Sequence, residues 1–447
     1  MQLCPAEKKK TTMGPSSKTE VVLINPQIYN LRYAPGGDNA WPLGVLAIGS
    51  VLKQKGYSVT VMDYHLQEDV KPLRQCIGPN TLFVGLSVMT PQLKQAVSIS
   101  GQIRGFSPET PIVWGGVHPS LEPEQVLNER HADYAVVGSG YGTAAALADA
   151  LRDGTSCEDI DGLAWRNGSG VRINPDVPSK TNLETLPAID YDLSSSREHY
   201  VNRALDWTGR QPTNYRKSYS VHSGIGCPHR CSFCVCTIIF KRRYYFKSAY
   251  RILEECQHYV DRFGANHIFF RDDNFFGNRR RLLEFLELYL ERGCNFTWDA
   301  SCRADYFRDN YINAEVTDKL RRTNCLLLNL GVESGSRRIR QMIRKDVEEE
   351  DVFRAAETMK KAGIISSYSF ITNLPTETPE EKRETQTLIT RIRQAAGPHW
   401  IIGPQPYRPY PGCELFDVAM ENFGLKKPQS VSQWIELMDR NIWFDRN

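Results

Sequence analysis

Residues 218–234 read SYSVHSGIGCPHRCSFC and place three cysteines directly behind a short strand-like segment. The segment Tyr219–His222 is rich in residues that favour strands, and the glycines after it mark its end. Cys227, Cys231 and Cys234 follow, separated by three and then by two residues. Thiolates are soft ligands that suit iron–sulfur clusters or zinc. The stretch therefore predicts a metal site on the loop that leaves this strand.

The segments after this loop alternate between short apolar runs and helix-like stretches. Six strand–helix units in about 190 residues predict an incomplete parallel barrel over residues 217–404, because eight units usually need roughly 250 residues. Active sites of such barrels lie at the carboxyl ends of the strands, where the cysteines stand. Residues 405–447 are rich in proline and aromatic residues, and we expect them to cap one end of the barrel.

The spacing of the cysteines alone does not distinguish zinc from an iron–sulfur cluster. A structural zinc site wants a fourth ligand, for which His229 and Cys236 are the nearest candidates. Three cysteines on a four-iron cluster instead leave one iron open to a small molecule. The position at a barrel mouth weighs against zinc. Cys236 is either a packed thiol or a group with a role in redox chemistry or cluster assembly.

The first third of the chain predicts a separate α/β domain. Nearly continuous apolar strands separated by helices over residues 19–152 are typical of a Rossmann-like, doubly wound parallel sheet. Ligands bind such sheets at the carboxyl ends of the strands. Residues 153–216 lack sustained periodicity and predict a linker with a small hairpin. Residues 1–18, rich in Lys, Thr, Ser and Pro, predict a disordered leader.

Composition excludes several classes of protein. The 447 residues include 55 Lys and Arg against 52 Asp and Glu, a net charge of +3 that gives no bulk attraction to nucleic acid. No apolar run reaches the roughly 20 residues of a transmembrane helix, and residues 1–10 lack a signal-peptide core. We therefore expect a cytoplasmic protein without a transmembrane segment. Its 12 cysteines then predict no disulfide framework.

The cysteine stretch resembles the radical S-adenosylmethionine (radical SAM) superfamily, whose signature is Cys-x3-Cys-x2-Cys with an aromatic residue before the last cysteine. Here that residue is Phe233. The resemblance implies a [4Fe-4S] cluster on Cys227, Cys231 and Cys234, with SAM at the open iron. An external donor of the flavodoxin or ferredoxin type would supply an electron that cleaves SAM. The resulting 5′-deoxyadenosyl radical would abstract hydrogen from an unactivated carbon.

Further features of the resemblance fall at predicted strand ends. Family members hold the methionine amino group after the second strand and contact the ribose or methionyl end after the fourth. A turn after the fifth strand lies near the adenine. An arginine after the third strand would bind the SAM carboxylate or pair with a nearby acid. The residues thus expected to bind SAM are Phe233, Asp272, Asp273, Arg303, Glu333, Ser334 and Asn373.

The domain order resembles the radical SAM subgroup with an N-terminal cobalamin-binding-type domain. Relatives commonly end the fifth strand with Gly-Glu-Gly-Glu, whereas this chain has Gly138-Ser139-Gly140-Tyr141 and loses both acids. The Asp-x-His-x-x-Gly cobalt-ligating motif is also absent. Cobalamin binding therefore stays open, and the cofactor could have been lost. The residues expected to line a corrinoid or substrate pocket are Ser87, Thr90, His118 and Ser139.

The substrate and the outcome of hydrogen abstraction are less constrained. Aromatic residues near the barrel entrance suggest a large apolar substrate, with a tetrapyrrole such as a bacteriochlorophyllide favoured. The altered Gly138–Tyr141 turn favours oxygen-independent hydroxylation or oxidation, and the alternative is cobalamin-dependent C-methylation. This subgroup includes anaerobic magnesium-protoporphyrin cyclases, bacteriochlorophyll tailoring enzymes and methyltransferases. A remote alternative is a metal-binding scaffold without catalysis.

Overall fold

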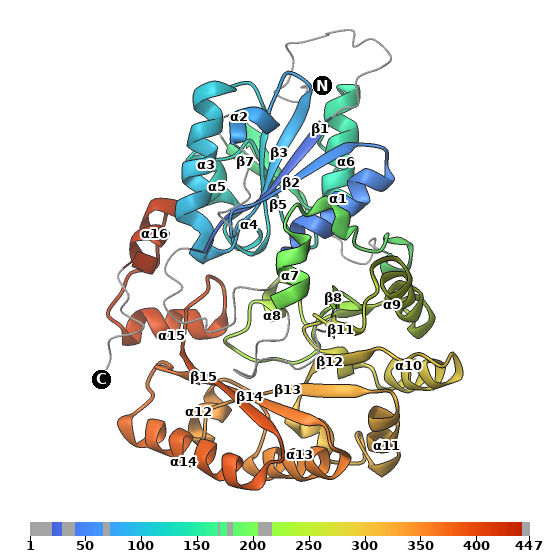
Figure 1. Ribbon diagram of the computed structural model, residues 1–447. Coiled ribbons are helices and arrows are strands. Elements are labelled where there is room, and N and C mark those ends of the chain that lie inside the picture. The colour runs from blue at the N-terminus through green and yellow to red at the C-terminus, as the bar shows by residue number, and fades with distance from the viewer. Residues whose placement is uncertain are drawn as a thin grey trace. The chain divides into compact units, whose positions relative to one another are not determined.

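The computed structural model describes residues 20–28, 41–65, 72–168, 170–176, 182–203 and 217–439 (Figure 1). Its contacts divide the chain into an N-terminal unit, Met1–Tyr200 with Pro428–Arg440, and a barrel unit, Val201–Lys427 with Asn441–Asn447. The predicted leader, residues 1–18, lies outside the described residues. Among the described helices, none combines the length and the low charge that crossing a bilayer requires.

The N-terminal unit contains one seven-stranded sheet in the order β2-β1-β3-β4-β5-β6-β7. The first five strands pair in parallel, as the sequence predicts. Strand β1 is almost wholly buried because its run of four apolar residues is covered on both faces. These strands are β1 (Glu20–Asn25), β2 (Ser58–Asp63), β3 (Thr81–Ser87), β4 (Ile112–Gly115) and β5 (Tyr134–Val136).

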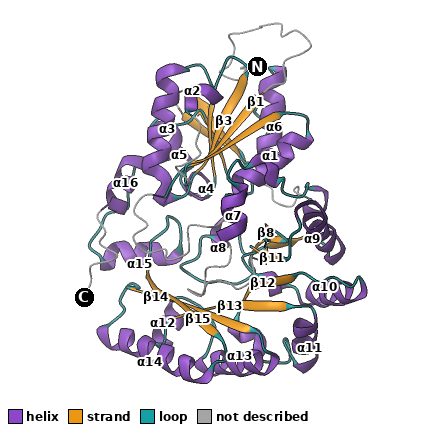
Figure 2. Cartoon of the chain, viewed as in Figure 1, coloured by secondary structure: helices purple, strands orange, loops and turns teal. Residues whose placement is uncertain are grey.

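Helices cover both faces of this sheet, with α1 and α6 on one side and α2, α3 and α5 on the other (Figure 2). Gly154 ends α6 in the left-handed conformation that glycine adopts without strain. The helices are α1 (Leu43–Gln54), α2 (Leu73–Cys76), η3 (Thr90–Gln92), α3 (Leu93–Phe106), α4 (Val117–Leu121), α5 (Pro123–Asn128), α6 (Tyr141–Asp153), η5 (Leu183–Thr185), η6 (Tyr191–Leu193) and α7 (Arg197–Arg203).

The predicted hairpin continues the N-terminal sheet instead of forming a separate linker. Its strands β6 (Leu163–Asn167) and β7 (Gly170–Ile173) add to β5 in antiparallel pairing. The sheet is therefore mixed, with the five predicted parallel strands followed by two antiparallel ones. A hairpin on β5 satisfies backbone groups that an edge strand would leave unpaired.

The C-terminal segment also differs from the prediction of a barrel cap. Helix α15 (Glu414–Asn422) belongs to the barrel unit, but α16 (Val431–Asp439) belongs to the N-terminal unit. Trp434 on α16 is fully buried and donates its indole N–H to Gln125 Oε1 at 3.0 Å. The aromatic side chain gives α16 a hydrophobic anchor on the N-terminal domain.

The barrel unit contains a six-stranded, all-parallel sheet in the order β15-β14-β13-β12-β11-β8. This confirms the predicted incomplete parallel barrel, with β8 and β15 at the two ends of the strand order. The strands are β8 (Ser218–Val221), β11 (His267–Phe270), β12 (Thr297–Cys302), β13 (Cys325–Glu333), β14 (Ile365–Thr372) and β15 (His399–Pro406).

Helices connect successive barrel strands, and a small hairpin of β9 (Gly224–Gly226) and β10 (Tyr244–Phe246) flanks the cysteine loop. Side-chain caps fix several helix starts; Ser248 Oγ, for example, accepts a hydrogen bond from the backbone N–H of Arg251. The helices are α8 (Cys236–Ile239), α9 (Ala249–Phe263), η8 (Phe275–Gly277), α10 (Arg279–Glu291), η9 (Ala304–Phe307), α11 (Ala314–Arg322), α12 (Arg337–Met342), α13 (Glu349–Ala362) and α14 (Pro379–Ala395).

Candidate active site

The cysteine loop begins at a glycine that no other residue could replace without rearrangement. Gly226 pairs with Tyr244 in the β9–β10 hairpin and has a φ of 83°, in the left-handed region. A Cβ atom there would lie 2.2 Å from the carbonyl oxygen of Arg243. The glycine therefore lets the chain turn closely past β10 and deliver Cys227 to the carboxyl end of the barrel.

Two acids after β11 hold the chain that enters this loop. Asp272 accepts hydrogen bonds from the backbone N–H of Ser223 at 2.7 Å and from its hydroxyl at 2.5 Å. Asp273 accepts from the backbone N–H of Gly226 at 3.0 Å. Burial raises the pKa of Asp272, although nearby Arg281 opposes that shift. Both acids thus have a structural contact, and their contact with the SAM amino group stays a prediction.

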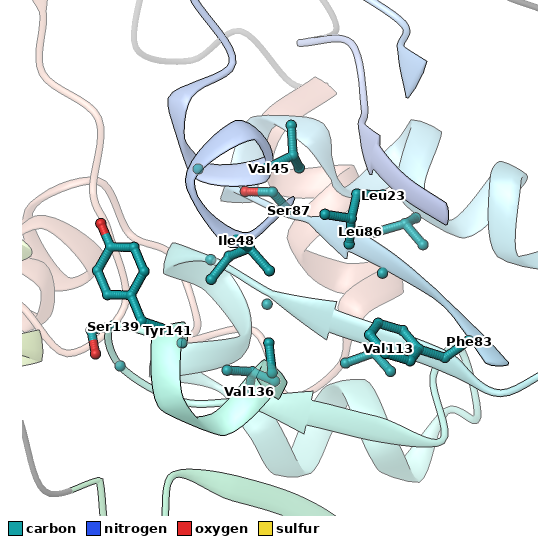
Figure 3. Close-up of a pocket in the computed structure, with 17 residues that line it drawn as sticks. Leu23, Val45, Ile48, Phe83, Leu86, Ser87, Val113, Val136, Ser139 and Tyr141 are labelled. Carbon is teal, nitrogen blue, oxygen red and sulfur yellow. The ribbon is translucent and has the colours of Figure 1, made fainter. Parts of the chain in front are cut away.

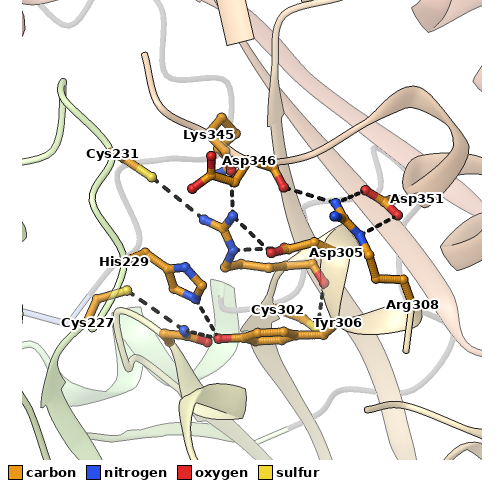
Figure 4. Close-up of polar contacts among 12 residues, drawn as sticks. Cys227, His229, Cys231, Cys302, Asp305, Tyr306, Arg308, Lys345, Asp346 and Asp351 are labelled. Atoms are coloured by element: carbon orange, nitrogen blue, oxygen red, sulfur yellow. Dashed lines mark hydrogen bonds and ion pairs between the residues drawn. The ribbon is translucent and has the colours of Figure 1, made fainter. Parts of the chain in front are cut away.

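Each of the three cysteines has a hydrogen-bond donor beside it, and Figure 4 shows the donors to Cys227 and Cys231. Asn274 Nδ2 lies 3.8 Å from Cys227 Sγ, and Arg303 Nη1 lies 3.7 Å from Cys231 Sγ. The Cys236 thiol donates to Cys234 and lowers the pKa of Cys234 to about 7. Burial, in contrast, raises the pKa of Cys227. Donors aimed at sulfur stabilise the thiolate form that a metal cluster requires.

The donor set fits an anionic iron–sulfur cluster. The three thiols stand on one loop at the barrel mouth, and the cationic side chains of Arg303 and Lys345 are buried nearby. Buried cations of this kind can balance thiolate charge. Within the described ranges, no three His, Cys, Asp or Glu side chains are gathered closely enough to hold a single metal ion. The donors beside the sulfurs and the buried cations are what fit Cys227, Cys231 and Cys234 as the residues that would hold the cluster.

Lys345 is a nearby cation that sequence reasoning did not single out. Its Nζ lies 2.8 Å from Glu333 Oε1, and both side chains are 9% exposed. Burial works against its charge, but Glu333 and Cys231 overcome that effect and raise the pKa of Lys345. Lys345 stands among four arginines between residues 337 and 344, so nothing in the sequence distinguished it.

The other residues predicted to bind SAM lie at the ends of β13 and β14 and on the cysteine loop. Glu333 ends β13 with a φ of 72°, a conformation costly for a side chain other than glycine and common at functional positions. Ser334 is fully buried, and its hydroxyl lies 3.3 Å from Thr385 Oγ1 on α14. Asn373 follows β14 with a φ of 58°. Phe233 is half-buried between the second and third cysteines. Their contacts with SAM stay predictions.

A chain of polar side chains that the sequence did not predict supports the cysteine loop. The Tyr306 hydroxyl lies 2.8 Å from His229 Nε2 and accepts a 2.6 Å hydrogen bond from Asn274 Nδ2. Burial lowers the pKa of His229 to about 4, so the ring is neutral near pH 7. The sequence placed His229 only as a candidate zinc ligand, since Tyr306 lies 77 residues away.

The N-terminal unit carries an apolar cleft at the carboxyl ends of its parallel strands (Figure 3). Leu23, Leu86 and Val136 line it from the sheet, and Val45 and Ile48 line it from α1. Glycines let the walls of the cleft pack closely, because a Cβ at Gly116 would lie 2.9 Å from the backbone nitrogen of Val88 and one at Gly85 would lie 2.9 Å from Leu23 Cδ2. Such a crevice fits a flat, largely apolar ring system.

The structure brings two of the four predicted pocket residues into this cleft. Ser87 and Ser139 line it, and Tyr141 stands beside Ser139. Thr90 and His118 do not line the cleft and are buried against each other, with Thr90 Oγ1 3.2 Å from His118 Nδ1. The Gly138–Tyr141 turn therefore still shapes the cleft without its two acids. The residues present fit a corrinoid, which would be held there by shape and apolar contact.

Two family profiles match the chain. The radical SAM superfamily profile matches residues 221–389, and the B12 binding domain profile matches residues 35–148. The first range contains all three predicted cluster cysteines. The second contains Ser87, the residues of α1 and the Gly138–Tyr141 turn that line the cleft. The profiles therefore coincide with the two candidate sites.

Relatives extend the resemblance over most of the chain. An uncharacterized methyltransferase of Pyrococcus horikoshii is 26% identical over 413 residues, which cover 90% of this chain and 83% of the relative. The anaerobic magnesium-protoporphyrin IX monomethyl ester cyclase of Rubrivivax gelatinosus is 25% identical, covering 95% and 75%. The fold resembles that of the radical SAM methyltransferase TsrM from Kitasatospora setae, solved with cobalamin and a [4Fe-4S] cluster (TM-score 0.69, 19% identity, covering 91% and 76%).

Proposed function

Since the chain belongs to the radical SAM superfamily and carries a B12-binding domain, we propose that it is a cobalamin-dependent C-methyltransferase. The observation that carries the proposal is the apolar cleft, because all of its lining residues except Leu23 lie within the range that matches the B12 binding domain. A bound cobalamin would supply the methyl group. A cluster on the three cysteines would, when reduced, supply the electron that cleaves SAM.

This proposal reverses the preference for hydroxylation or oxidation that the sequence suggested. That preference came from the loss of two acids in the Gly138–Tyr141 turn. The turn nevertheless lines the cleft through Ser139 and Tyr141. The loss of the two acids therefore does not remove a pocket for a corrinoid. The methyltransferase relative from Pyrococcus horikoshii supports the same choice.

The chain's own residues would orient SAM and exclude water. Glu333 ends a barrel strand and is fixed by the buried Lys345, so its carboxylate has a defined position beside the cysteine loop. Several buried hydroxyl and carboxylate oxygens at this end have no partner among the described residues: Tyr244 Oη, Glu377 Oε1 and Tyr407 Oη. Unpaired buried polar atoms are costly unless a ligand satisfies them. They are therefore candidates for contacts with SAM or the acceptor substrate.

We propose a large apolar acceptor and favour a tetrapyrrole. The supporting observations are the half-buried aromatic residues of β10, Tyr244–Phe246, which flank the cysteine loop, and the cyclase relative from Rubrivivax gelatinosus. That relative also favours a second candidate function, oxidative ring formation on a tetrapyrrole. The two functions differ in whether a methyl group from SAM enters the product.

The test is an anaerobic reaction with SAM that carries a trideuterated methyl group. Protein reconstituted with iron, sulfide and hydroxocobalamin is incubated with a low-potential reductant and candidate tetrapyrroles. We expect stoichiometric corrinoid in the visible spectrum and a product heavier by one labelled methyl group. Cys231→Ala should abolish 5′-deoxyadenosine, whereas Cys256→Ala, a buried thiol on α9, should not. Protein that binds no corrinoid would contradict the proposal, and unlabelled oxidised product would favour the second function.

A further inference from the structure

Two of the cysteine sulfurs lie within reach of nitrogen donors from other strand ends. Asn274 Nδ2 is 3.8 Å from Cys227 Sγ, and Arg303 Nη1 is 3.7 Å from Cys231 Sγ (Figure 4). We propose that Asn274 and Arg303 are positioning residues that set the midpoint potential of the cluster by donating to its ligand sulfurs. The inference rests on the proposed cluster, which iron analysis of the wild type tests separately.

The surrounding contacts fix the amide of Asn274. The same Nδ2 donates to the Tyr306 hydroxyl at 2.6 Å, and that hydroxyl lies 2.8 Å from His229 Nε2. Tyr306 in turn stacks on Tyr311, with ring centroids 4.6 Å apart. Asn274 is only 2% exposed, so water does not compete for its donors. The amide nitrogen is thus held toward Cys227 by its contact with Tyr306.

Three hydrogen bonds, to Asp305 and to the backbone of Lys345, fix the guanidinium of Arg303. Its Nε and Nη2 donate to the two carboxylate oxygens of Asp305 at 2.8 and 3.1 Å. Nη2 also donates to the backbone carbonyl of Lys345. Because the guanidinium is planar, these bonds determine the direction in which Nη1 projects, which is toward Cys231. The geometry therefore gives Arg303 a contact with a cluster ligand. It also shows the pairing with a nearby acid that the sequence offered as one of two alternatives, while a contact with the SAM carboxylate stays a prediction.

Hydrogen bonds to ligand sulfurs change the ease of reduction. Reduction adds negative charge to the cluster and its sulfurs, so a donor stabilises the reduced state more than the oxidised one and raises the potential. Arg303 carries a permanent charge and is buried, where screening by solvent is weak. We therefore expect a larger effect from Arg303 than from the neutral amide of Asn274, with Asp305 moderating it.

The experiment is a redox titration of anaerobically reconstituted holoenzyme, followed by the EPR signal of the reduced cluster. Arg303→Gln and Asn274→Leu should each lower the midpoint potential, with the larger shift for Arg303→Gln. Tyr306→Phe, which removes the hydroxyl that holds the amide, should shift it in the same direction but less. Arg308→Gln is the matched control, because Arg308 bonds Asp351 and the carbonyl of Asp346 in the same network. Its potential should equal that of the wild type.

Iron content and SAM affinity separate the competing explanations. Wild-type potentials in iron-replete Arg303→Gln and Asn274→Leu would overturn the proposal, and so would an Arg303→Gln variant altered only in its dissociation constant for SAM. If Arg303→Gln and Asn274→Leu lose iron, the same titration is made on Arg303→Lys and Asn274→Asp. Lysine keeps the charge and should restore much of the potential, whereas aspartate should lower it further. Loss of iron from all four folded variants would also overturn the proposal, since it would assign these residues to cluster retention.

Discussion

His118 gives the N-terminal unit a predicted sensitivity to acid. Its ring is fully buried, its Nε2 has no partner among the described residues, and the ring centroid of Trp434 lies 5.8 Å away. Burial lowers the pKa of His118 from 6.5 to about 3. The folded unit therefore holds the ring neutral, whereas the unfolded chain binds a proton below pH 6.5.

The sign and size of the effect follow from this difference. The stability that the neutral ring contributes is complete above pH 6.5 and is lost as the pH falls toward 3. On going from pH 7.5 to pH 5.0, stability is lost only below the unfolded-state pKa of 6.5, that is, over about one and a half pH units. Each pH unit costs about 1.4 kcal/mol. His118 alone should therefore remove about 2 kcal/mol of stability by pH 5.0.

The assay compares the wild type with His118→Gln, which keeps a polar group near Thr90 but does not titrate. Hydrogen exchange of peptides from β4 and α16 reports the opening free energy of this unit at both pH values. We expect the wild type to lose about 2 kcal/mol more than the variant. An equal loss in both proteins would refute the assignment of His118 as a buried neutral group. It would also reopen its predicted place in a corrinoid pocket.

Three further predictions follow from particular contacts. Gly116→Ala should weaken cobalamin binding, measured by spectral titration, because the added Cβ would crowd Val88. The control is Gly105→Ala on α3, where an added Cβ would meet no atom within 4 Å. This control should leave cobalamin binding unchanged and raise the free energy of unfolding by up to about 1 kcal/mol. Trp434→Ala should lower the free energy of unfolding of the N-terminal unit by roughly 3–5 kcal/mol and make α16 a site of rapid proteolysis. Cleavage of the variant at the slow wild-type rate would contradict the role of Trp434 as an anchor. Cys231→Ala should lower the iron content, whereas Cys236→Ala should retain it, and equal losses would make Cys236 a ligand.

Much of the fold could be predicted from local sequence pattern. All six barrel strands and the five parallel strands of the N-terminal sheet fall on segments that the alternation of strand-like and helix-like stretches predicts. The place of β6 and β7 in the N-terminal sheet could not be predicted, because pairing with β5 joins residues about 30 apart and leaves no local pattern. The position of α16 was equally hidden, since Trp434 packs on residues some 300 positions away.

The site shows a similar division. Cys227, Cys231 and Cys234 stand out because their spacing is chemically specific, and Glu333 stands out because it ends a strand. Arg303 was identified by its strand end, but its contact with Cys231 depends on folding across 72 residues. Tyr306 and Lys345 gave no signal, since neither their type nor their spacing differs from those of ordinary surface residues. Positioning residues depend on tertiary contact and are therefore the part of a site that sequence reveals least.

The most direct test of the central claim is EPR spectroscopy of the anaerobically prepared, chemically reduced protein before and after SAM is added. Three cysteines on a four-iron cluster leave one iron for SAM. We therefore predict a [4Fe-4S] signal whose shape changes when SAM binds. A folded protein with no such signal, or with a signal that SAM leaves unchanged, would contradict the account.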